Sequence, residues 1–154
     1  MEWTKTHDYL QLVMKKELET MRQLLDNMNL EEQFILRKEK QYWSSMMEER
    51  THLIKQLNTI RQDRLVVTEK LETLTQHTNV PLEKLLPEQD TNSWEILSLR
   101  DQMVTLLDRM NLQTSRNEML LHLAQTPMPA QVPQSKKKIS IATLPSEDYK
   151  EGDA

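Results

Sequence analysis

The sequence predicts an all-α protein in which a long antiparallel helical hairpin and a third long helix form a three-helix, coiled-coil-like bundle, followed by a disordered C-terminal tail. In three long segments the apolar residues recur at alternating steps of three and four, which is the spacing of one face of an α-helix. The only glycine is Gly152, so the body has no glycine for hairpin turns or phosphate-binding loops. With 37% hydrophobic, 29% charged and 5% aromatic residues, the composition suits long amphipathic helices better than a compact core.

The predicted helices span residues 6–37, 41–77 and 93–125, and they form one domain, 1–125, before a flexible tail, 126–154. The stripe of the first helix comprises Leu10, Met14, Met21, Leu24, Met28 and Ile35, with Glu17 as its polar exception. The stripe of the second turns polar at Glu49 and Arg64 and otherwise comprises Tyr42, Met46, Leu53, Leu57, Ile60, Val67, Leu71 and Leu74. Charged residues are expected on the solvated opposite face, among them Glu48, Glu49, Arg50 and Lys55.

The junction between the first two helices is ambiguous in the sequence. Residues 37–41, RKEKQ, contain no proline, glycine or capping serine. The pattern therefore permits one helix of about 70 residues, about 105 Å long, or a hairpin with a turn at 38–41. The end of the second helix is marked by Asn79 and by Val80-Pro81, because a residue before proline is disfavoured in the helical conformation. A short helical turn is expected at 81–86, ended by Pro87.

The third helix has the widest apolar surface. Its main stripe runs from Ile96 to Met110 and resumes at Leu120 after the polar Gln113 and Asn117, and a second row one position over widens it. This width exceeds what a two-helix seam needs, so the helix is predicted to bind an amphipathic partner helix as well as the hairpin. The residues predicted to contact this partner helix are Ile96, Leu99, Met103, Leu106, Leu107, Met110, Leu120 and Leu121.

Catalytic and metal-binding patterns are missing from the sequence. There is no cysteine, and the histidines His7, His52, His77 and His122 are too far apart for a helix-borne zinc site. The adjacent pairs Glu31–Glu32 and Glu48–Glu49 are expected to be solvated, since neighbouring residues diverge by about 100° on a helix. The prediction is a protein that is not an enzyme and has no cofactor.

The charge and hydropathy limit the partners. The net charge of −4 disfavours nucleic-acid binding, and no apolar run approaches the roughly 18 residues that a membrane span needs. The N-terminal MEWTKTHDYL lacks the apolar core of a secretory signal, so a cytoplasmic location is expected.

Methionine and tryptophan are placed at characteristic positions. Six of the ten methionines lie on the apolar stripes, where they are expected to fill irregular core gaps or to form an adaptable binding surface: Met14, Met21, Met28, Met46, Met103 and Met110. Trp3, Trp43 and Trp94 stand near predicted helix ends, where a ring can cover the end of a seam.

The tail begins with Pro127, Pro129 and Pro133, which rule out a helix there. Three lysines then precede the alternating Ile139, Ile141 and Leu144. This pattern is typical of a short linear binding motif, and the alternative is a solubilising flexible end.

Four features in a fixed order carry a resemblance to a known family. They are the acidic residues and aliphatic pair at 31–36, the Arg50 ahead of Leu53 and Ile54, the segment LEKLLPEQ at 82–89, and RNEMLL at 116–121. In this order the chain, over residues 8–125, resembles the FlgN-type flagellar and type III secretion export chaperones. It departs from that family at the first turn, where Lys38, Glu39 and Lys40 replace small residues, and at Thr114, which replaces an amide.

The resemblance implies a bacterial cytoplasmic chaperone that binds the amphipathic C-terminal helix of hook-associated or other type III substrates. It also implies delivery of that client to the export gate or the export ATPase complex, with Tyr149 in the tail as a gate contact. The chaperone would be a monomer or a homodimer. The alternative is a structural coiled-coil component or adaptor of a secretion apparatus, whose stripes would be paired permanently in a homo-oligomer.

Overall fold

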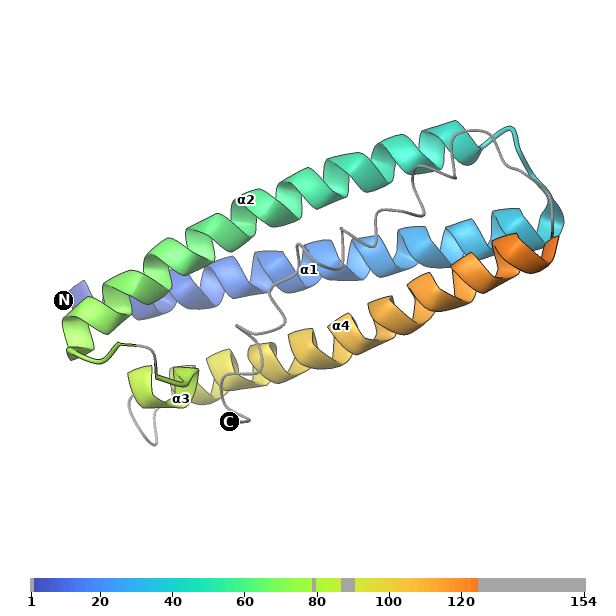
Figure 1. Cartoon of the computed structure of the whole chain (residues 1–154). Coiled ribbons are helices and arrows are strands. Elements are labelled where there is room, and N and C mark those ends of the chain that lie inside the picture. The colour runs from blue at the N-terminus through green and yellow to red at the C-terminus, as the bar shows by residue number, and fades with distance from the viewer. Residues whose placement is uncertain (1, 79, 87–90, 125–154) are drawn as a thin grey trace.

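The computed structural model describes residues 2–78, 80–86 and 91–124, and all regular secondary structure in these ranges is helical. The helices are α1 (Glu2–Arg37), α2 (Trp43–Thr75), the short α3 (Leu82–Leu85) and α4 (Thr91–Ala124). α2 runs antiparallel to α1, and α4 then runs in the same direction as α1 (Figure 1). The predicted all-α hairpin with a third long helix is therefore confirmed. The predicted tail, 126–154, and Tyr149 lie outside the described residues.

The two long seams of the bundle both involve α1. This helix packs along its length against α2 and against α4, whereas the backbones of α2 and α4 approach each other closely at few points. Figure 1 accordingly shows α1 between the other two long helices. The side chains of all three nevertheless share one core, which α3 extends with Leu82 and Leu85. Arg100 of α4 contacts Glu83 and so ties α3 to α4.

The junction left open by the sequence is a tight turn between Arg37 and Trp43. Lys38 adopts a left-handed conformation with φ of 55°. Its N–H donates to the carbonyl of Ile35, and the N–H of Glu39 donates to the carbonyl of Phe34, 3.3 and 3.0 Å away. These two bonds form a Schellman motif, which normally uses glycine at the left-handed position. Gln76, with φ of 62°, ends α2 in the same conformation.

The methionines and tryptophans divide clearly. All six stripe methionines are buried, which confirms that they fill the core: Met14, Met21, Met28, Met46, Met103 and Met110. Trp43 is also buried and forms a smaller cluster with Phe34 and Ile35 beside the turn. Trp94 is 66% exposed, so the expectation that its ring covers a seam was wrong.

The left-handed Lys38 leads to a stability prediction. A residue with a side chain is about 1–2 kcal/mol less stable than glycine in this conformation. Part of this advantage of glycine is offset, because glycine loses more conformational entropy on folding. Lys38→Gly should therefore raise the free energy of unfolding by about 0.5–1 kcal/mol, measured by urea denaturation. The control is Lys40→Gly in the same turn, at a residue without positive φ. A destabilised Lys38→Gly protein would contradict this account of the turn.

Candidate functional site

The predicted client-binding stripe is mostly core. Ile96, Leu99, Met103, Leu106, Leu107 and Met110 are at most 8% exposed and belong to the cluster shared with α1 and α2. Leu120 and Leu121 are partly buried against the cluster around Trp43. The stripe is wide because α4 packs on a core to which both α1 and α2 contribute side chains. These residues therefore do not form an open client surface in this structure, and that part of the prediction is corrected.

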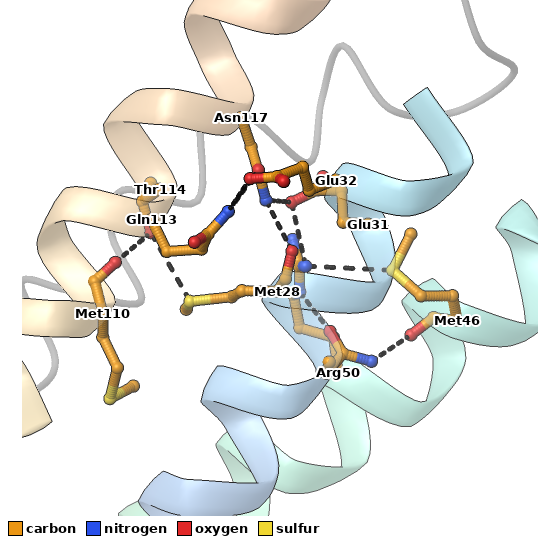
Figure 2. A network of polar contacts seen from close by, with 10 residues as sticks. Met28, Glu31, Glu32, Met46, Arg50, Met110, Gln113, Thr114 and Asn117 are labelled. Carbon is orange, nitrogen blue, oxygen red and sulfur yellow. Dashed lines mark hydrogen bonds and ion pairs between the residues drawn. The ribbon is translucent and has the colours of Figure 1, made fainter. Parts of the chain in front are cut away.

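A polar network joins the three long helices near the turn (Figure 2). The carboxylate of Glu31 in α1 accepts hydrogen bonds from Arg50 of α2 and from Asn117 of α4, at 3.0 and 2.7 Å. Arg50 also donates to the side-chain carbonyl of Asn27, at 2.7 Å. The amide of Asn117 reaches the backbone carbonyl of Met28, at 2.8 Å. The buried carboxylate of Glu31 thus bonds to one residue of α2 and to one residue of α4.

The structure corrects two expectations about charged residues. Glu31 and Arg50 were expected on solvated faces, but each side chain is only 9% exposed. Their desolvation is offset because each charge meets its opposite and further hydrogen bonds fill the remaining sites. Glu48 and Glu49 are exposed, as predicted.

Glu32 forms the outer edge of the network. It accepts a hydrogen bond from the amide of Gln113, at 2.8 Å, and another from Arg116. The hydrogen bond from Gln113, then that from Arg116 and the positive charge of Arg116, lower the pKa of Glu32 below its usual value despite partial burial. Glu32 was expected to be solvated, but it also links α1 to α4.

A second buried ion pair lies further along the α1–α2 seam. Arg64 contacts Glu17 at 2.7 Å, and the two side chains are 8% and 0% exposed. Glu17 and Glu31 are two heptads apart on α1, and Arg50 and Arg64 are two heptads apart on α2. The polar exceptions of the two apolar stripes therefore face each other, although the polar position near the turn is Arg50 and not Glu49.

Large apolar side chains are exposed on the far side of α4. Leu112, Met119 and Leu123 are 72%, 63% and 68% exposed, and their steps of seven and four place them on one face. We call these three residues the outer stripe. Leu36 and Tyr42, both more than half exposed, lie at the same end of the bundle, where α1 turns into α2. Sequence reasoning missed the outer stripe because the wider row on the other side of α4 dominated the pattern.

The remaining candidate features in the described ranges are the histidines, the acidic residues and the apolar character of the helices. No group of three His, Asp or Glu side chains there is placed to hold a metal ion. His7 is buried beside Ser93 in the α1–α4 seam, whereas His52, His77 and His122 are exposed. None of the described helices combines the length and apolar character that a membrane crossing requires.

Comparison of the chain with models of protein families, with characterised proteins and with solved structures finds no match.

The burial of the predicted stripe yields a test with a matched control. Met103→Asp with Leu107→Asp would place two carboxylates in the core, where burial of a charge without a partner is prohibitive. We expect loss of most of the helical circular dichroism signal. Leu112→Asp with Met119→Asp makes the same chemical change on the outer stripe and should leave that signal intact. Retained helicity in the core variant would mean that the stripe is accessible after all.

The buried ion pair yields a second test. Glu17→Leu leaves the Arg64 guanidinium buried without its carboxylate and should lower the free energy of unfolding by about 3–5 kcal/mol. Adding Arg64→Met should restore most of that loss, because two apolar side chains replace the pair. The exposed pair of Arg22 and Glu19, 4.0 Å apart, provides the control, since Glu19→Leu should change stability by less than about 1 kcal/mol. A double variant as unstable as Glu17→Leu alone would contradict this interpretation.

Proposed function

We propose that this protein is a FlgN-type export chaperone that holds the amphipathic helix of a secreted protein in the cytoplasm. The observation that carries the proposal is the outer stripe of α4. It leaves three large apolar side chains exposed on a bundle whose own core is already closed. An apolar row of this spacing is the complement of one face of an amphipathic helix.

The residues that carry the family resemblance support the proposal by their position. Glu31 and Glu32 come from the first feature, Arg50 from the second, and Arg116 and Asn117 from the last. They are up to 86 positions apart in the chain, yet they meet in one network. The segment LEKL forms α3, and its leucines are buried in the core. The order of these features in the sequence therefore corresponds to a physical contact among the helices.

The area of the outer stripe suits a short partner helix better than a second copy of the chain. Burial of about 400 Å² of apolar area would supply about 10 kcal/mol gross at 25 cal/mol/Å². Ordering and association offset most of that energy, which leaves binding near the micromolar range. A stable protein dimer usually buries about 1,200–2,000 Å². Reversible capture of a client helix is consistent with this smaller area.

The tail completes the proposal. Residues 126–154 follow α4 directly after the outer stripe, so a tail-borne motif would be tethered near a bound client. Tyr149 would contact the export gate or export ATPase complex, since aromatic side chains dominate small interfaces.

The competing function is a structural coiled-coil component of a secretion apparatus. That function would leave the long apolar stripes open for permanent pairing with other copies. In this chain the stripes of α1, α2 and α4 cover one another. This observation weighs in favour of the chaperone.

Affinity capture from a native bacterial lysate tests the proposal. The full chain should recover a secreted protein with an amphipathic helical end, and Leu112→Asp with Met119→Asp should reduce recovery at least tenfold. The tail-truncated chain, 1–125, should still capture the client, because the client site lies on α4.

The matched control is Leu12→Asp with Val66→Asp, which alters apolar side chains that are 47% and 64% exposed on α1 and α2. This control should capture the client normally. Recovery of the chain's own copies alone would favour the structural component. Equal loss in both double variants would remove the outer stripe as the site.

A further inference from the structure

The face of α4 that carries the outer stripe becomes polar toward the N-terminal end of the helix. Thr105 and Ser98 precede Leu112 at steps of seven, which keeps the three residues on one face. Both polar side chains are exposed. A partner helix that packs on the outer stripe and extends in this direction therefore meets a different kind of surface.

A hollow between α1 and α4 lies at this polar part of the face. Its lining includes Leu18, Arg22, Ser98, Thr105, Leu106 and Arg109. Leu18 and Leu106 are 4% and 7% exposed, so they supply the apolar inner wall. The hollow has a volume of about 350 Å³. This volume is about ten times the share of one water molecule in the liquid, so the hollow can admit a whole side chain.

Two arginines line the hollow, one from each helix. The side chain of Arg22 is 54% exposed. One of its Nη atoms donates to the side-chain oxygen of Gln102, at 3.2 Å, and the other lies 4.0 Å from a carboxylate oxygen of Glu19. Among the residues that the structure describes, none forms a hydrogen bond or ion pair with the exposed Arg109. Since a guanidinium has five N–H donors, both arginines can still donate to an acceptor that enters the hollow.

The acidic side chains nearby leave a positive charge at the hollow. Asp101 also lines it, but its carboxylate accepts hydrogen bonds from Nε and Nη of Arg100, at 3.2 and 3.0 Å. Glu19 is 61% exposed, and an exposed pair at 4.0 Å is weak. The other charged side chains of the lining are Arg22 and Arg109. The hollow therefore favours an anionic group.

The hollow begins about one helical turn from the outer stripe. Arg109 precedes Leu112 by three positions, or about 4.5 Å along the axis, and Thr105 precedes it by seven, or about 10 Å. A helix on the outer stripe that continues for one or two more turns along α4 thus passes over the hollow.

We propose that the client helix carries a glutamate or aspartate one turn beyond its apolar stripe, and that this carboxylate binds in the hollow between Arg22 and Arg109. The apolar residues of the client pack on the outer stripe, and the methylene groups of its acidic side chain contact Leu18 and Leu106. This inference rests on the proposed chaperone function and defines the class of client: an amphipathic helix whose apolar stripe ends in an acidic residue.

The charges select an acidic client residue over other side chains. A lysine or arginine at the same client position would face two guanidinium groups, and a neutral amide would form weaker hydrogen bonds than a carboxylate. A second copy of this chain is disfavoured as the occupant, because it would present Arg109 and Arg116 along the same face. Like charges across an interface oppose such pairing.

Helical peptides test the proposal on the full chain. Each has apolar residues at steps of four and seven, the spacing of the outer stripe, and a test residue four positions beyond that stripe. The test residue precedes the stripe in one set and follows it in the other, so both helix directions are covered. Fluorescence anisotropy at about 50 mM salt should show, in one set, that the glutamate peptide binds at least about threefold more tightly than the glutamine peptide (about 0.7 kcal/mol). At about 500 mM salt this preference should shrink, because exposed charges are screened.

Variants of the two arginines locate the contact. Arg22→Gln with Arg109→Gln should remove the preference for glutamate. Arg22→Glu with Arg109→Glu should invert it, so that a lysine peptide binds more tightly than the glutamate peptide. The matched control is Arg37→Gln with Lys55→Gln, which removes two positive charges from exposed positions outside the hollow and should keep the preference. All four side chains are exposed, so the helical circular dichroism signal should stay unchanged in every variant.

Equal affinity of the glutamate and glutamine peptides in both sets would overturn the inference, and so would a preference that both arginine variants retain. Binding of no peptide at about 100 µM (about 5.5 kcal/mol) would also overturn it. The same holds for self-association through this face, or for peptide binding only after removal of 126–154, which would make the tail the occupant.

The inference and the chaperone function can fail separately. Leu112→Asp with Met119→Asp should abolish binding of every peptide, and a glutamate preference that persists in this variant would overturn the inference. Peptides that bind equally well but require the outer stripe would leave the chaperone function standing. A clear glutamate preference without capture of any client from lysate would contradict the chaperone function and not the chemistry of the hollow.

Discussion

Two buried ion pairs fix the register of the α1–α2 hairpin, and the rest of the structure depends on that register. α1 supplies Glu17 and Glu31, and α2 supplies Arg64 and Arg50, with the same two-heptad spacing on both helices. A hairpin shifted by one heptad would oppose these charges to apolar side chains, which costs several kcal/mol for each unpaired charge. Repetitive leucine and methionine stripes pack nearly as well in shifted registers, so the charges supply the specificity that the stripes lack.

The position of α4 follows from the same network. The side-chain amide of Asn117 donates hydrogen bonds to the carboxylate of Glu31 and to a backbone carbonyl of α1. Both bonds form at only one axial position of α4 relative to α1. Gln113 and Arg116 add bonds to Glu32 one turn away. Once α4 is held there, its broad stripe faces the core and the outer stripe faces away from it. Exposure of Leu112, Met119 and Leu123 is thus a consequence of the polar contacts near the turn.

The long helices could be predicted from the sequence because steps of three and four are a property of one helix at a time. The turn at Lys38 could not, because a Schellman motif without glycine leaves no residue-type signal. Glu17 and Arg64 were visible as polar interruptions, but their pairing needs the register of two helices. The client stripe was misplaced for a related reason: the width of an apolar face does not show whether the covering partner belongs to the same chain. Ile96 and Met103 lie in the core. The face of α4 that is free to bind a partner can be identified only once its buried face is known.

The buried polar side chains of the bundle differ in how well they are paired. Each unpaired buried group costs about 1–3 kcal/mol, against a total stability of about 5–15 kcal/mol for a typical domain. Asn27, Asn117 and Glu31 have partners, whereas the side-chain oxygens of Asn58 in α2 and Asn111 in α4 are buried without one. Leucine at those two positions would remove that cost, so the two asparagines lower the free energy of unfolding of the isolated chain.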